Sequence, residues 1–192
     1  MNHSLFRPRA TVAGRLGAAT LLTAALLGGQ AAQAQTAQTA QATQVALVGE
    51  DYRKVNQLIT TKNYAAALQE ADSYLANNPR DPQMRLLRSR VLVAQGKTDE
   101  ARNQLLTITQ EYPEIAEPYN NLAVLYAQAG ELDLARTALE SAVRINPGYA
   151  VALHNLGDVY RRMAHEHYSK ALALQPGNRT LQEKAQAMRA AR

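Results

Sequence analysis

The 192-residue chain contains no cysteine and no tryptophan, and it has a single phenylalanine. Without a thiol, disulfides, thiolate metal sites, cysteine nucleophiles and lipid-modified cysteines are excluded. The sequence also lacks a glycine-rich phosphate loop, a GxGxxG or GxSxG turn and an HExxH pair. These absences predict a protein that is not an enzyme and that needs no cofactor.

Long hydrophobic runs are also missing. The most apolar segment, Leu16–Leu27, is too short to span a membrane. It follows three arginines and precedes small residues that suit a signal peptidase, Ala32-Gln33-Ala34. We therefore expect residues 1–34 to be a secretory signal peptide, cleaved after Ala34, which would place the protein in the periplasm or outside the cell. A permanent N-terminal anchor is the alternative.

The excess of basic residues largely belongs to this segment. The chain carries 21 Lys and Arg against 16 Asp and Glu, a net charge of +5. Residues 1–34 contain three of the basic residues and none of the acidic ones, so the remainder has 18 against 16, or +2. A nearly neutral surface of mixed charge gives no electrostatic reason to expect nucleic-acid binding. With the signal removed, no membrane-spanning segment is expected.

The rest of the chain divides into a short leader and one helical domain. Residues 35–46 are rich in Gln, Ala and Thr, and they lack the large apolar side chains that would repay the entropy of ordering. From residue 47 to 192 the apolar residues follow a helical period, and no segment alternates with the period of two that a strand requires. We predict a flexible leader followed by an all-α domain.

Proline and glycine are sparse in that domain, but they are regularly placed. Helix-ending prolines recur 34 residues apart, at Pro79, Pro113 and Pro147. Between the last two, Tyr119, Leu122, Ala123 and Tyr126 have the spacing W-x2-L-G-x2-Y, with Tyr for Trp and Ala for Gly. Farther on, the same unit has Gly130 at its turn and then small and large residues at helical spacing, Ala135, Leu139 and Ala142. This segment resembles the tetratricopeptide repeat, a 34-residue pair of antiparallel helices.

The resemblance implies a right-handed α–α superhelix. The repeats would span residues 48–79, 82–113, 116–147 and 150–176, and a capping helix would span 178–191. Lys62 stands where the first of these repeats should have its turn glycine. A terminal helix with one apolar and one polar face is what the open end of a solenoid requires.

The fourth unit departs from the pattern. Tyr126 and Ala135 are nine residues apart, but the corresponding Tyr160 and Ala164 are only four apart, so the five residues of the turn are missing. Apolar and small residues then form one stripe at about 100° per residue along an unbroken segment. We predict that the two helices of this unit are fused into one long helix, which ends at Pro176.

In the family that this chain resembles, the first helix of each repeat lines a concave groove that binds a protein or peptide. The corresponding positions here are Tyr52, Asn56, Ile59, Leu86, Arg90, Val93, Asn120, Val124, Gln128, His154, Asp158, Arg161 and Arg162. The resemblance and the expected signal peptide together predict a non-catalytic periplasmic adaptor or scaffold in cell-envelope assembly or folding. The sequence does not name its partner. The alternatives are a structural subunit of a permanent envelope complex and, less favoured, a metal-binding protein that uses the histidines of the predicted long helix.

The only dense polar cluster lies on the predicted long helix, between His154 and His167. His154, Asp158 and His165 are side chains that suit zinc or nickel. However, the two histidines are three turns apart, so Asp158 and one of them could share an ion but all three could not. We therefore expect no metal site here. The cluster is either a solvated face or part of the groove, where its arginines would suit acidic groups.

Overall fold

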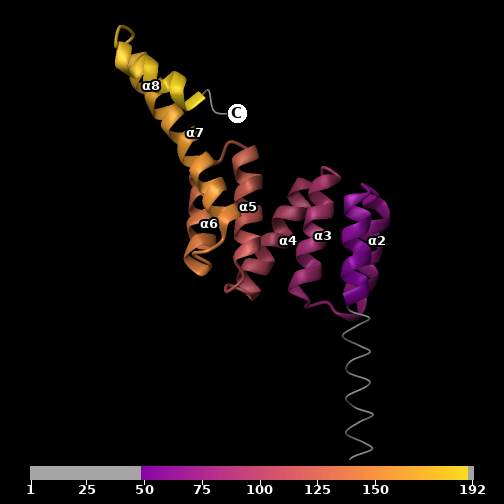
Figure 1. The fold of residues 1–192 in the computed structure, drawn as a ribbon. Helices are drawn as coiled ribbons and strands as arrows, with labels where there is room; N and C mark the ends of the chain where they lie inside the picture. The colour runs from indigo at the N-terminus through magenta and orange to yellow at the C-terminus, as the bar shows by residue number, and fades with distance from the viewer. Residues whose placement is uncertain (1–48, 190–192) are drawn as a thin grey trace, which may run out of the picture. The chain divides into compact units, whose positions relative to one another are not determined.

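The computed structural model describes residues 49–189, and every regular element in that range is an α-helix. The predicted signal peptide and the predicted leader lie outside the described residues. Figure 1 shows the described helices stacked side by side, each lying next to the helix that follows it. This arrangement confirms the predicted all-α solenoid of helix pairs.

The described residues form a helix at their start and seven further helices. A helix over residues 49–60 is followed by α2 (Tyr64–Asn77), α3 (Pro82–Ala94), α4 (Thr98–Glu111), α5 (Ala116–Gln128), α6 (Leu132–Ile145), α7 (Ala150–Leu174) and α8 (Arg179–Arg189). None of the helices within residues 49–189 is long and apolar enough to cross a membrane.

The turn inside each helix pair has the same backbone geometry. Lys62, Gly96 and Gly130 lie 34 residues apart, and their φ angles are +60°, +76° and +81°. A positive φ ends a helix readily when the residue is glycine, because no Cβ then meets the backbone. The first turn achieves the same conformation with a lysine, whose Cβ makes it unfavourable by about 1–2 kcal/mol.

Replacing Lys62 with glycine should therefore stabilise the domain by about 1 kcal/mol, since relief of the left-handed strain outweighs the extra freedom that glycine gives the unfolded chain. The measurement is urea denaturation followed by circular dichroism. Lys97→Gly, which replaces a lysine at negative φ beside the second turn, is the matched control and should not stabilise. Equal effects of the two substitutions would contradict this explanation.

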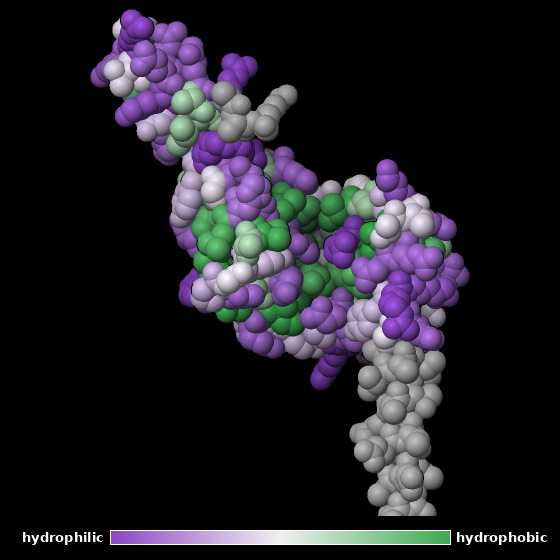
Figure 2. Space-filling model, viewed as in Figure 1, coloured by the Kyte–Doolittle hydropathy of each residue, from purple (hydrophilic) through white to green (hydrophobic). Residues whose placement is uncertain are grey.

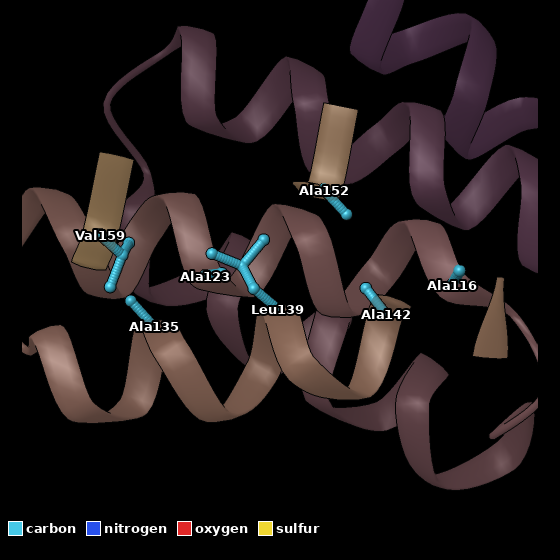
Figure 3. Close-up of a cluster of buried hydrophobic side chains, with 7 residues drawn as sticks. All are labelled: Ala116, Ala123, Ala135, Leu139, Ala142, Ala152 and Val159. Carbon is cyan, nitrogen blue, oxygen red and sulfur yellow. The ribbon is translucent and has the colours of Figure 1, made fainter. Parts of the chain in front are cut away.

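Small residues set the distance between the helices. A buried cluster between α5, α6 and α7 contains five alanines, three of them from the predicted pattern, together with Leu139, which is 1% exposed. Figure 3 shows the alanine side chains and Leu139 pointing into the space between these helices. Equivalent clusters fill the space between the earlier helices, around Leu92 and Leu105 and around Val55 and Met84. Alanine lets helix backbones approach closely, and the large side chains beside it fill the remaining space.

The fourth unit contains the predicted single helix. α7 runs without a break for 25 residues, from Ala150 to Leu174. Its first half packs against α5 and α6, and its second half lies beside α8. The predicted capping helix over 178–191 corresponds to α8, in which only Ala185 is buried.

Candidate functional site

Two neighbouring hollows lie along the first helices of the repeats. One, of about 320 Å³, is mostly apolar and is lined by residues of the helix over 49–60, α2, α3, α4 and α5: Ile59, Tyr64, Ser89, Arg90, Val93, Ala94, Leu105, Asn121, Val124 and Leu125. The other, of about 240 Å³, is lined by residues of α5, α6 and α7: Ala123, Val124, Ala127, Gln128, Leu139, Asn155, Asp158, Val159, Arg161 and Arg162. Val124 belongs to both linings and is 37% exposed. Figure 2 shows apolar surface in the hollowed centre of the face turned to the viewer.

These linings include several of the groove residues that the sequence predicts. Arg90, Val93 and Ile59 line the apolar hollow, and Gln128, Asp158, Arg161 and Arg162 line the other. The structure thus brings side chains from repeats far apart in the sequence onto one surface. One end is mostly apolar and includes Arg90, and the other includes Arg161 and Arg162.

Two predicted groove residues are buried instead. Leu86 is 9% exposed and packs in the cluster around Leu92 and Leu105. Asn120 is 4% exposed, and its Oδ1 accepts a hydrogen bond of 2.8 Å from Nδ2 of Asn155. Both were wrongly assigned to the groove. A helix in a solenoid has neighbours on more than one side, so a residue next to the groove-facing positions can already be buried against another helix.

The first-repeat residues serve another purpose. The hydroxyl of Tyr52 donates to Asp81 Oδ2 at 2.5 Å, and its ring lies 5.7 Å from that of Tyr74. Asn56 is exposed, but its Nδ2 donates to the carbonyl of Tyr52 on its own helix. Neither side chain belongs to the lining of the two hollows, so among the described residues this surface begins at Ile59. Tyr52 fixes one helix pair to the next and is not free for a ligand.

The polar cluster of α7 holds the ends of neighbouring helices. Arg162 Nη1 donates to the carbonyl of Ala127, in the last turn of α5, at 2.7 Å. Arg161 Nη1 donates to the carbonyl of Met188, in the last turn of α8, at 3.2 Å, while its Nη2 contacts Asp158 Oδ1 at 3.1 Å. The last carbonyls of a helix lack partners within it, and a cation favours the negative end of the helix dipole. Both arginines therefore have structural contacts as well as remaining N–H donors.

A third, larger hollow of about 890 Å³ lies where α8 ends beside α7. It is lined by His154, Asp158, Arg161, Arg162, His165, Glu166, Met188 and Arg189. His165 Nδ1 lies 2.9 Å from the carbonyl of Ala185, so this imidazole contacts α8, whereas His154 is 77% exposed and lies 3.5 Å from Asp158. Within the described part of the chain, no three His, Asp or Glu side chains come together as a metal-binding group.

Two asparagines of the site, Asn121 and Asn155, are absent from the predicted groove residues. Asn155 lines the hollow between α5 and α7 and hydrogen-bonds across to Asn120. It lies 34 residues after Asn121, which lines the other hollow. The repeat period could therefore have found it, because equivalent positions of successive repeats face the same surface.

Comparisons with known proteins agree with this geometry. A family model described as tetratricopeptide repeat matches residues 52–107 and 86–150. The uncharacterized protein ycf37 of Pyropia yezoensis is 39% identical over 71 residues, which cover 34% of this chain and 40% of that protein. The tetratricopeptide repeat domain-containing protein PYG7, chloroplastic, of Arabidopsis thaliana is 31% identical over 81 residues, 40% of this chain and 27% of that protein. The chain thus spans less than half the length of these relatives.

Among solved structures, a thermophilic TPR protein of Thermus thermophilus superposes with a TM-score of 0.55 at 25% identity, covering 72% of this chain and 79% of that one. YrrB, described as a TPR protein with an unusual peptide-binding site, has a TM-score of 0.50 at 27% identity and 54% coverage of both chains. The family model extends over more than half of the chain, and the helix pairs, turns and alanine-lined core have the form that this family requires. The chain belongs to the tetratricopeptide repeat family.

Proposed function

We propose that this protein is a non-catalytic scaffold that binds an extended segment of a partner protein along the two neighbouring hollows. The observation that supports this proposal most directly is that Val124 lines both hollows. The mostly apolar hollow is therefore next to the one that contains Arg161 and Arg162. A surface that crosses the first helices of successive repeats suits a ligand longer than one side chain. The family is generally one of protein-interaction modules, and YrrB is described as having a peptide-binding site.

The chemistry of the hollows indicates the kind of segment. The apolar hollow has Ile59, Val93 and Val124 in its lining and suits an aliphatic or aromatic side chain. At the other end, Arg161 and Arg162 each use one or two N–H groups on the protein, and a guanidinium has five. The remaining donors suit a carboxylate. The proposed ligand is thus a segment with an apolar residue next to an acidic one.

The test uses a labelled peptide selected on the wild-type protein from a random-peptide library. Val124→Asp should weaken its binding at least about tenfold, since it places a negative charge between an apolar hollow and an acidic ligand group. The matched control is Leu134→Asp: Leu134 is 50% exposed on α6 and contributes to neither lining. Fluorescence anisotropy gives the two dissociation constants. Equal binding by the two variants, or a library that yields no binder, would refute the proposal.

We further propose that the scaffold is exported and acts in the cell envelope. What supports this is the order of arginines, apolar residues and small residues within positions 1–34. The protein isolated from its own cells should begin at Gln35 or within a few residues of it, as N-terminal sequencing would show. A cytoplasmic species that retains Met1 would contradict the proposed location.

A further inference from the structure

The fused helix α7 leaves part of the fourth unit uncovered. In the third repeat, Ala123 is 1% exposed because α6 packs over it. Gly157, the same position one repeat later, is exposed. Tyr160 is 47% exposed and Leu153 is 46% exposed, whereas their counterparts Tyr126 and Tyr119 are half-buried. The first half of α7 therefore lacks the second helix that normally lies against it.

The side of α7 that faces the preceding repeat keeps its cover. Ala152 and Val159 are 0% and 3% exposed, as buried as Pro118 and Leu125 one repeat earlier. These residues face the preceding repeat, and that contact is complete. The exposed residues are those that face the second helix of the same repeat, so the defect is the missing partner helix and not a frayed end.

The second half of α7 shows the complementary defect. Its residues Ala164, Tyr168 and Ala171 take the places of Ala135, Leu139 and Ala142, which are at most 1% exposed. In α7 all three are only half-buried, although α8 lies beside them and Lys184 sits 5.5 Å from the Tyr168 ring. This half therefore has the sequence pattern of the second helix of a repeat, but no first helix of the same repeat packs against it.

Both defects lie on one stripe of α7. At about 100° per residue, Leu153, Gly157, Tyr160, Ala164 and Ala171 fall on the same side of the helix, and none of them is charged. The two halves match each other but cannot meet, since they belong to one continuous helix. Leu153 and Ala171 are 18 residues apart, or about 27 Å along the axis.

We propose that the stripe is a dimerisation surface that takes the α7 helix of a second copy of this chain, packed antiparallel. The second half of each α7 then covers the first half of the other, and each copy restores the helix pair that the five-residue deletion removed. The arrangement has two-fold symmetry, with the same surface used twice, as in domain-swapped dimers. Gly157 and Ala164 let the two backbones approach closely, as alanines do within the complete repeats.

The first test changes the stripe without disturbing the monomer. A Cβ added at Gly157 meets no atom within 4 Å, and glycine inside a helix is less favourable than glutamate. Gly157→Glu should therefore leave the helix intact and abolish the dimer. Ser169→Glu adds the same charge on the opposite side of α7, where Ser169 is exposed, and should leave the dimer intact.

Light scattering coupled to size-exclusion chromatography, on the protein purified as its host produces it, gives the masses. We expect twice the chain mass for the wild type and Ser169→Glu, and one chain mass for Gly157→Glu. A monomeric wild type would overturn the proposal, as would dimers of both variants or the loss of the dimer in both.

A second test distinguishes the dimer from a hairpin formed by α7 bending back on itself. The chain has no cysteine, so a Leu153→Cys, Ala171→Cys double variant carries only the two introduced thiols. A disulfide requires Cα atoms within about 7 Å, so an intact α7 cannot form one within the chain. Mild oxidation should give a covalent dimer on a non-reducing gel. An intramolecular disulfide, or no disulfide, would refute antiparallel pairing.

Discussion

Replacing Leu139 with alanine should lower the free energy of unfolding by about 2–5 kcal/mol. Leu139 is 1% exposed, and it is the large side chain in a cluster otherwise made mainly of alanines. Figure 3 shows it between α5, α6 and α7. Five of the six other buried residues of the cluster are alanines, which have no side-chain atoms beyond Cβ with which to fill the space. Most of the cavity would therefore persist, and its cost adds to the lost hydrophobic burial.

The matched control is the same substitution on the same helix. Leu134 is 50% exposed, so Leu134→Ala should change the free energy of unfolding by no more than about 0.5 kcal/mol. Urea denaturation monitored by circular dichroism measures both. Similar effects of the two changes would mean that α6 does not pack on α5 and α7 as described.

Replacing Asp81 with alanine should cost about 2 kcal/mol, although its carboxylate is only partly buried. Asp81 Oδ1 accepts from the backbone N–H of Met84 at 3.0 Å and so caps α3. Its Oδ2 accepts from the hydroxyls of Tyr52 and Tyr74, at 2.5 Å and 2.9 Å. One carboxylate thus joins the helix over 49–60, α2 and α3, and alanine would remove the cap and both tyrosine partners together.

The same contacts make this contribution depend on pH. Burial raises the pKa of Asp81, but hydrogen bonds from Tyr52, the Met84 N–H and Tyr74 outweigh it, so its pKa lies below the ordinary value of 3.8. A folded-state pKa that is lowered stabilises the fold fully above the unfolded value and loses its effect as pH falls through the folded value. The difference in stability between wild type and Asp81→Asn should therefore be constant above about pH 5 and shrink below pH 3.8.

Thermal denaturation of wild type, Asp81→Ala and Asp81→Asn at several pH values tests both statements. Asp99 is the control: it lies in the first turn of α4, is exposed and is not the residue that caps the helix. Asp99→Ala should cost at most about 0.5 kcal/mol. If Asp81→Ala proves as mild as Asp99→Ala, the tyrosine contacts do not stabilise the fold.

The sequence by itself determined the architecture, because the signals for it are local and periodic. Prolines 34 residues apart, the turn glycines and the spacing of alanines predicted an all-α solenoid of helix pairs, and the described residues form one. The deletion between Tyr160 and Ala164 predicted the single helix α7, since a helix continues where no turn residue stops it. Eight predicted groove residues, among them Arg90, Val124 and Gln128, line the two hollows for the same reason: repeat register fixes which face a residue occupies.

Only the tertiary structure decided what those side chains contact. Leu86 and Asn120 follow the groove pattern, yet neighbouring helices bury both. The sequence predicted Arg161 and Arg162 as donors to acidic groups, but the carbonyl ends of α8 and α5 also lie within hydrogen-bonding distance of them. Whether a face is covered depends on helices that are distant along the chain and on the angle at which they pack, and a local pattern contains neither. For the same reason the sequence predicted an apolar stripe on α7, and the structure showed how much of it lies open.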